Sequence, residues 1–236
     1  MDRTGLRYYF DMAYKVRIDG IYDQRTLKHL KLSGMKEFCF EFSPKSFNFI
    51  QEHIFLQQLV PLFSESDRLF VHFSRSNDPM VMKLADDMAA AGVNMNNVFF
   101  EFDQWSPEMK AENFEHNYLL SFSNDPEITS ALGKKFCGFY FYFSFFEDLY
   151  HKNLLQRFAA NFYTRFGASI DDSAFFIMKM NWNSNLISSL FDLFEFNMVA
   201  LPINPDIEVC YRNVDLKKLS SEMNLLKRNK FLRQEF

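Results

Sequence analysis

The chain has 236 residues, of which 48% are hydrophobic and 24% charged, so it can bury a large core within a single domain that spans residues 1–236. Its formal net charge is −4 and its basic residues are scattered, which argues against nucleic acid as a partner. No apolar run approaches the roughly 18 residues of a membrane span, and charges interrupt the N-terminal segment where a signal peptide needs an apolar core, so we expect a cytoplasmic protein without membrane contact.

Eight short runs rich in aromatic and β-branched residues predict strands along the chain. They are Ala13–Ile18, Glu37–Phe42, Arg68–Phe73, Asn97–Phe102, Asn117–Phe122, Phe136–Phe143, Ala174–Met180 and Asn197–Ile203.

Helical patterns separate these runs, and several begin with a capping residue followed by proline at the first helical position. The expected helices are Asp23–Leu32, Ile50–Phe63, Pro79–Ala91, Pro107–Phe114, Pro126–Leu132, Phe146–Phe166, Leu186–Phe194 and Leu216–Leu232. Four of the seven glycines stand where such a helix ends and predict left-handed caps, namely Gly34, Gly92, Gly133 and Gly167.

Eight strands alternating with eight helices predict an α/β fold, a single (β/α)8 TIM barrel. A doubly wound open sheet is the alternative, but no glycine-rich nucleotide loop follows the first strand. In a TIM barrel the site lies at the carboxyl ends of the strands. Functional residues are therefore sought there.

Cysteine and motif content indicates neither a metal nor a cofactor. The three cysteines Cys39, Cys137 and Cys210 are odd in number and lack metal-ligand spacing, so they are expected to be reduced. The sequence contains no nucleophile elbow, P-loop or zinc motif.

Four segments carry a family resemblance. Lys15–Ile21 (KVRIDGI) and Cys39–Ile50 (CFEFSPKSFNFI) are similar to the first strand and second loop of phosphoribosylanthranilate isomerase, a TIM barrel of tryptophan biosynthesis. Val98–Gln104 and Asn197–Leu219 resemble later segments of that family. The resemblance implies the barrel fold and, for an intact member, the Amadori rearrangement of an aminoaldose phosphate.

The residues that the family uses for this reaction are changed here. Asp19 stands where the family has its catalytic cysteine, and no acidic residue occurs between Phe136 and Phe146, where the family has its acid. Asn48 replaces the arginine that binds the substrate carboxylate, and it cannot form a charged clamp. The glycines of the family's phosphate loops are absent from Asn181–Asn185 and Leu201–Pro205.

Charged residues nevertheless lie within the strands. By two-residue periodicity and the family's frame, Arg17, Asp19 and Glu101 should point into the barrel, where buried charges must pair. One hypothesis is therefore an internal network in which Arg17 and Lys179 neutralise Asp19, Glu41 and Glu101.

The favoured interpretation is a pseudoenzyme that binds a protein partner or acts as a scaffold. Its partner-binding surface would be the aromatic segment that includes Tyr142, Phe143, Phe145 and Phe146.

The alternative is an active isomerase or lyase that acts on a small, perhaps phosphorylated, substrate. Asp19 or Glu101 would then be the base, and Lys179 the electrophile or Schiff-base amine. Its substrate-binding residues would be Lys45, Asn48 and His72. A metal held by carboxylates and His72 is a further, less favoured option because no spacing motif supports it.

Overall fold

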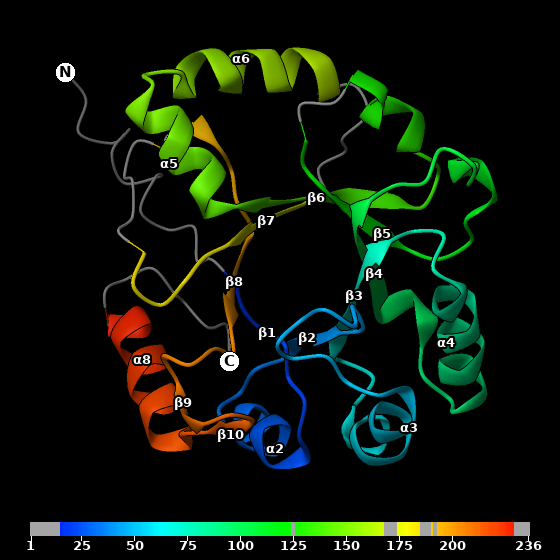
Figure 1. Cartoon of the computed structure of the whole chain (residues 1–236), viewed down its shortest axis with the longest axis vertical. Helices are drawn as coiled ribbons and strands as arrows, with labels where there is room; N and C mark the ends of the chain where they lie inside the picture. Colours follow the sequence, from blue (N-terminus) through cyan, green and yellow to red (C-terminus); the bar gives the residue numbers. More distant parts are fainter. Residues whose placement is uncertain (1–14, 124–125, 168–173, 185–189, 191–192, 229–236) are drawn as a thin grey trace.

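Eight parallel strands form the centre of the molecule. The computed structural model describes residues 15–123, 126–167, 174–184, 190 and 193–228. The strands pair in sequence order, and β8 pairs back with β1, which closes the barrel (Figure 1). Their bounds are β1 Lys15–Asp19, β2 Glu37–Glu41, β3 Arg68–Arg75, β4 Val98–Gln104, β5 Tyr118–Ser121, β6 Phe136–Tyr142, β7 Phe175–Lys179 and β8 Met198–Pro202.

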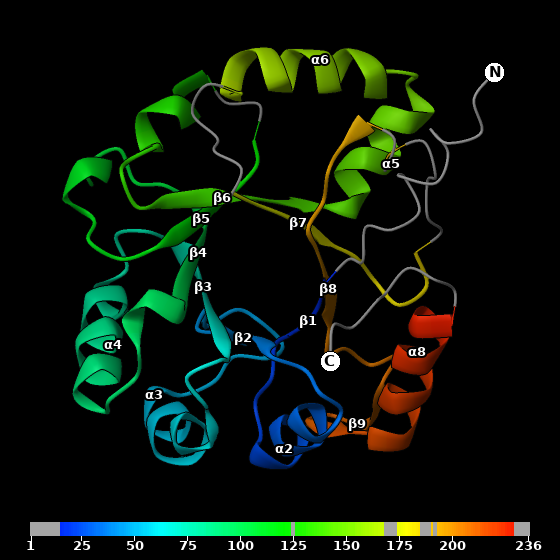
Figure 2. The ribbon, with the colours of Figure 1, turned by 180° about the vertical axis from the view of Figure 1, so that it is seen from behind.

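Helical segments surround this barrel when it is seen from either end (Figures 1 and 2). The α-helices are α2 Gln24–Leu32, α3 Glu52–Ile54, α4 Pro79–Ala90, α5 Phe143–His151, α6 Leu155–Phe166 and α8 Leu216–Arg228. A π-helical segment, η1 Phe55–Leu59, follows α3, and the 3₁₀ segments are η2 Val60–Leu62, η3 Met95–Asn97, η4 Ala111–Asn113 and η5 Pro126–Ala131. No helix in the described part of the chain is long and apolar enough to cross a membrane.

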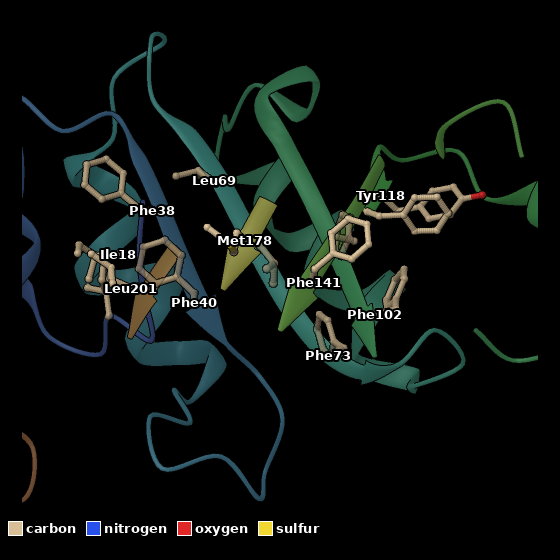
Figure 3. Close-up of a cluster of buried hydrophobic side chains, with 14 of the residues drawn as sticks. Ile18, Phe38, Phe40, Leu69, Phe73, Phe102, Tyr118, Phe141, Met178 and Leu201 are labelled. Carbon is tan, nitrogen blue, oxygen red and sulfur yellow. The ribbon is translucent and has the colours of Figure 1, made fainter. Parts of the chain in front are cut away.

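Strand side chains alternate between two hydrophobic layers. Outward-facing residues such as Phe40, Phe102 and Phe141 pack in the large core beneath the helices (Figure 3). The intervening positions face the barrel interior and form a smaller cluster that includes Phe70 and Phe99. This alternation decides which residues can reach the barrel mouth.

The predicted strands agree with the observed ones to within two residues, and the predicted TIM barrel is confirmed. Each strand carries enough aromatic and β-branched residues to bury both faces of a parallel sheet. The open-sheet alternative is wrong because β1 and β8 are hydrogen-bonded neighbours.

Several helix predictions differ from the structure. Only one 3₁₀ turn, Ala111–Asn113, forms within the predicted helix Pro107–Phe114. The predicted helix Phe146–Phe166 is two helices, α5 and α6, separated at Asn153, whose φ of 55° is left-handed. Most of the predicted helix Leu186–Phe194 lies outside the described residues, as does the end of Leu216–Leu232.

Two of the four predicted glycine caps are confirmed. Gly34 and Gly92 have φ of 84° and 83° and end helices α2 and α4. Gly167 keeps right-handed helical geometry, and Gly133 is not left-handed either. Gly133 is needed for close packing, since a Cβ there would lie 2.3 Å from the Ala111 carbonyl oxygen.

A short antiparallel hairpin, β9 Glu208–Cys210 and β10 Asn213–Val214, lies between β8 and α8. Its strands are too short for a sequence pattern to predict. The hairpin places Val209 and Tyr211 at the surface on the carboxyl side of the barrel.

Candidate functional site

Arg17 is the centre of the charged groups inside the barrel. It lies on β1, is completely buried, and stacks over the Phe70 ring with 4.4 Å between its Cζ and the ring centroid. Its Nε donates to Asp19 Oδ1 at 2.6 Å, and its Nη1 donates to Glu101 Oε1 at 2.5 Å. The remaining nitrogen donates to the second oxygen of each carboxylate, so Arg17 contacts both at once.

Lys179 of β7 completes this group. Its Nζ lies 2.9 Å from Glu101 Oε2, 3.7 Å from Asp19 Oδ2 and 4.0 Å from the centroid of the Tyr140 ring. We call Arg17, Asp19, Glu101 and Lys179 the interior ion network. Every charge in it faces an opposite charge, as burial requires.

The interior ion network fixes the protonation states of its members. Burial alone would raise the pKa of Glu101, but the charges of Arg17 and Lys179 lower this pKa to about 2. Burial likewise opposes the charge on Lys179, yet Glu101 and Asp19 raise the pKa of its ammonium. Glu101 and Lys179 are therefore charged at neutral pH.

A second polar group surrounds His72 on β3. Nδ1 of His72 is 2.8 Å from both carboxylate oxygens of Glu41, and its Nε2 is 3.3 Å from Asp103 Oδ1. The hydroxyl groups of Tyr140 and Tyr142 donate to the same Asp103 oxygen at 2.9 and 3.0 Å. We call these five residues the histidine cluster.

His72 is an imidazolium in this setting. Burial and the charge of Lys179 lower its pKa, but hydrogen bonds to Asp103 and Glu41 outweigh them and raise the pKa of His72 to about 9. Both ring nitrogens then donate to carboxylates. Burial alone would raise the pKa of Asp103, but its pairing with His72 lowers this pKa to about 2. The Asp103 side chain is 35% exposed and faces the mouth of the barrel.

The network agrees with the sequence-based hypothesis in part. Arg17 and Lys179 do pair with Asp19 and Glu101. Glu41 is different, because it bonds to His72. The hypothesis assigned Arg17 and Lys179 to Glu41 as well, whereas in the structure the cation that faces Glu41 is the His72 imidazolium.

One group of side chains has the spacing of a metal site. Asp19, Cys39 and Glu101 each offer a ligand atom, and these atoms lie within 4.8 Å of one another. Both carboxylates, however, already accept hydrogen bonds from Arg17. Burial and the charge of Asp19 also raise the pKa of Cys39, which keeps the thiol protonated. Arg17 thus supplies the positive charge that a metal would bring, and the donor set does not suit an added cation.

The three predicted substrate-binding residues have different surroundings. Lys45 is exposed on the loop after β2. Asn48 is buried over the turn at Gly20, and its Nδ2 donates to the Ile203 carbonyl at 2.5 Å. His72 lies deeper, within the histidine cluster. The structure therefore does not gather them around one substrate position.

The predicted partner-binding aromatics also need correction. Phe143 and Phe146 are buried where α5 packs on the barrel, and Phe145 is half-buried against Phe158 with ring centroids 5.0 Å apart. Helix α5 begins directly after β6, so these rings turn inward to cover the barrel. Of the four residues only Tyr142, at 45%, is exposed, and it belongs to the histidine cluster.

In the described parts of the loops after β7 and β8, several backbone donors are already hydrogen-bonded within the protein. Trp182 Nε1 donates to the Pro202 carbonyl at 2.7 Å and so bridges the ends of these strands. A carboxylate, Asp206, accepts from Asn204 at 3.2 Å and from Asn183 at 3.4 Å. Backbone N–H groups that are already hydrogen-bonded within the protein belong to Met180, Asn181, Ser184, Ile203, Asp206 and Ile207. A negative charge and engaged donors are unfavourable for phosphate.

Sequence reasoning missed Asp103 and Tyr140 as members of the site. The two-residue alternation that places Glu101 inside the barrel also places Asp103 inside, one step nearer the mouth. Tyr140 and Tyr142 are likewise two residues apart on β6, so their side chains lie on the same face of the strand. The sequence therefore contains the spacing that groups Asp103 with Glu101 and Tyr140 with Tyr142. The site is missed because an aromatic run such as that of β6 predicts core.

No protein-family model and no curated protein sequence matches the chain. Solved structures of similar fold include phosphoribosyl anthranilate isomerase from Thermotoga maritima, with 13% identity and a TM-score of 0.57 over 91% of this chain and 99% of that one. TrpF from Jonesia denitrificans has 10% identity and a TM-score of 0.57 over 94% and 100% of the two chains. The Thermus thermophilus isomerase has 14% identity and a TM-score of 0.54 over 90% and 99%. The fold thus resembles that of phosphoribosylanthranilate isomerase.

Proposed function

We propose that this chain is a barrel of the phosphoribosylanthranilate isomerase type that has lost the isomerase reaction and acts by binding a protein. The observation that carries the proposal is the position of Arg17, which is buried and hydrogen-bonded to both Asp19 and Glu101. These are the two carboxylates that an acid–base mechanism would use.

A general base needs an accessible oxygen and a pKa near the working pH. Glu101 has neither, since it is fully buried and its pKa is lowered to about 2. Asp19 is partly exposed, but both of its oxygens accept from Arg17. Proton abstraction by either would break ion pairs inside the barrel.

Lys179 is equally unsuited to the role of Schiff-base amine. A Schiff-base lysine must lose its proton before it attacks a carbonyl, which requires a lowered pKa. Here Glu101 and Asp19 raise the pKa of Lys179 despite burial. The ammonium is therefore a structural cation, and its attraction to the Tyr140 ring stabilises it further.

The proposal is tested by expressing the chain in a tryptophan auxotroph that lacks the isomerase, with an authentic isomerase as the positive control. We expect no growth without tryptophan, and no turnover by the purified protein. Growth that disappears with Asp19→Asn would contradict the proposal, because it would show that the chain retains the reaction.

The second candidate is an enzyme that acts on another small molecule, and the partial exposure of Asp103 and Tyr142 at the mouth favours it. Such a substrate would touch the histidine cluster first. Thermal shift measurements on the wild type and on Asp103→Asn, with a panel of small phosphorylated and carboxylated sugars and amines, distinguish the two candidates. A ligand that stabilises only the wild type supports the enzyme.

A further inference from the structure

Large exposed apolar side chains gather beside the β9–β10 hairpin. Val209 and Tyr211 are 69% and 68% exposed, and the Phe47 ring, 41% exposed, lies edge-on to Tyr211 with 5.1 Å between centroids. Phe47 belongs to the loop after β2, so two separate segments contribute to one apolar patch. We call Phe47, Val209 and Tyr211 the hairpin patch.

The hairpin patch is held in place by the protein beneath it. Arg212 donates to the Phe49 carbonyl at 2.9 Å and stacks over the Tyr22 ring at 4.5 Å, which ties the hairpin to the β2 loop and to the end of β1. Arg25 of α2 donates to Asn213 and to the Val214 carbonyl. Val209 and Tyr211 are therefore exposed on a hairpin whose conformation is already fixed. A partner that binds such a surface does not have to order the hairpin first, so less conformational entropy is lost on binding.

The exposed charges around the hairpin patch are basic. Arg25, Lys45, Lys217 and Lys218 are all exposed on the segments that surround it. The nearby acidic residues are half-buried and accept hydrogen bonds: Asp23 and Asp215 cap helices α2 and α8, Asp206 accepts from Asn204, and Glu208 accepts from the Tyr22 hydroxyl. The charged side chains that are exposed here are therefore basic, although the chain as a whole carries a net charge of −4.

We propose that the hairpin patch is the docking surface for an acidic protein segment that packs apolar side chains on the exposed faces of Val209 and of the Phe47–Tyr211 ring pair. Charge complementarity selects this partner, since carboxylates flanking the apolar anchors would face Arg25, Lys45, Lys217 and Lys218. A second copy of the chain does not fit, because two-fold pairing would place the same basic residues opposite one another. The inference rests on the binding role proposed above and names its partner.

Fluorescence anisotropy tests the proposal on the whole chain. The probe is a labelled synthetic peptide in which leucine and tryptophan alternate with glutamate, and its counterpart has lysine in place of every glutamate. We expect the acidic peptide alone to bind, and to bind more weakly as NaCl screens the charges. Loss of the Tyr211 ring in Tyr211→Ala should weaken binding about tenfold, as for an interface anchor.

Charge reversal supplies an independent variant, and matched controls lie elsewhere on the surface. The double change Lys217→Glu and Lys218→Glu should abolish binding without harming the fold, because acidic side chains are favourable in the first turn of a helix. Tyr150→Ala and the paired Lys134→Glu and Lys135→Glu, which change exposed residues far from the hairpin along the chain, should bind as the wild type does.

Four outcomes overturn the proposal. They are absence of binding by the acidic peptide, an equal loss in the control variants, tighter binding to single-stranded DNA or to vesicles of phosphatidylserine and phosphatidylcholine, and dimerisation that Tyr211→Ala abolishes. None of them depends on isomerase activity. The peptide-binding experiment can therefore contradict the docking surface while the auxotroph experiment still supports the loss of isomerase activity, and the reverse also holds.

Discussion

Arg17 is the residue on which the interior charges depend. In Arg17→Met, the ion-pair partner left to the carboxylates of Asp19 and Glu101 among the described residues would be Lys179. Because removing one partner leaves a buried charge uncompensated, we expect the free energy of unfolding to fall by about 3–5 kcal/mol. Urea unfolding followed by circular dichroism measures this.

Two further variants separate charge from geometry at this position. Arg17→Lys retains the positive charge but cannot bond both carboxylates with a planar fork, so it should lose stability to a smaller extent than Arg17→Met. Lys45→Gln, on the exposed loop, should be neutral. If Arg17→Met were as stable as Lys45→Gln, the interior ion network would have no stabilising role.

His72 makes stability depend on pH on the alkaline side. Its pKa is raised to about 9 in the folded protein, above the roughly 6.5 of an unfolded chain. The stabilisation is therefore complete below about pH 6.5 and is lost as the pH rises through 9, by an amount on the order of 3 kcal/mol. Urea unfolding at closely spaced pH values should show this decline.

His72→Gln is the matched control for the pH effect, since its amide N–H can still donate to one of the two carboxylates, Glu41 or Asp103, but does not titrate. The variant should be less stable than the wild type at pH 6.5 and should approach it at pH 9. An identical decline in the variant would show that another group is responsible.

Among the elements, β6 depends most on a glycine. Gly138 has φ of 138°, and a Cβ there would lie 2.0 Å from the Phe175 carbonyl oxygen on β7. Gly138→Ala combines backbone strain with a clash between strands, so we expect a loss of about 3 kcal/mol or more. Thermal and urea unfolding measure it.

Gly92 provides the matched comparison at the end of α4. Its φ of 83° is also left-handed, but nothing lies within 4 Å of the position of an added Cβ. Gly92→Ala should therefore cost only the intrinsic penalty of about 1–2 kcal/mol. Equal losses in Gly92→Ala and Gly138→Ala would mean that the contact with β7 is unimportant.

The sequence predicts strands better than the connections between them. Every strand is a short run of closely spaced apolar residues, which is easy to recognise. By contrast, Pro107–Phe114 has the proline typical of a helix start, yet the helical structure it forms is a single 3₁₀ turn at Ala111–Asn113. In that segment Phe114 and Trp105 pack against Tyr118, and this tertiary packing outweighs helix propensity. Local patterns do not contain such contacts.

For the whole molecule, the order of strands and helices along the chain is sufficient to predict the barrel. The contacts within the site, however, depend on which strands come together in space. Two-residue alternation correctly placed Arg17, Asp19 and Glu101 inside, yet it could not say that Glu41 would pair with His72. Nor could it show that α5 would turn Phe143 and Phe146 into the core. Partners on different strands are fixed by barrel closure, which no local pattern encodes.

Closure of the barrel also predicts how the molecule unfolds. Every strand from β1 to β8 has two hydrogen-bonded neighbours, so separating the barrel into parts breaks strand pairing at two places. Trp105 follows β4 and Trp182 follows β7, so the two report on opposite parts of the ring. Trp105→Phe and Trp182→Phe each leave one tryptophan. In each variant, the unfolding transition measured by fluorescence of that tryptophan should coincide with the transition measured by far-ultraviolet circular dichroism. Fluorescence and circular dichroism midpoints that differ within one variant would show instead that part of the barrel unfolds first, and that residues 1–236 do not form a single cooperative domain.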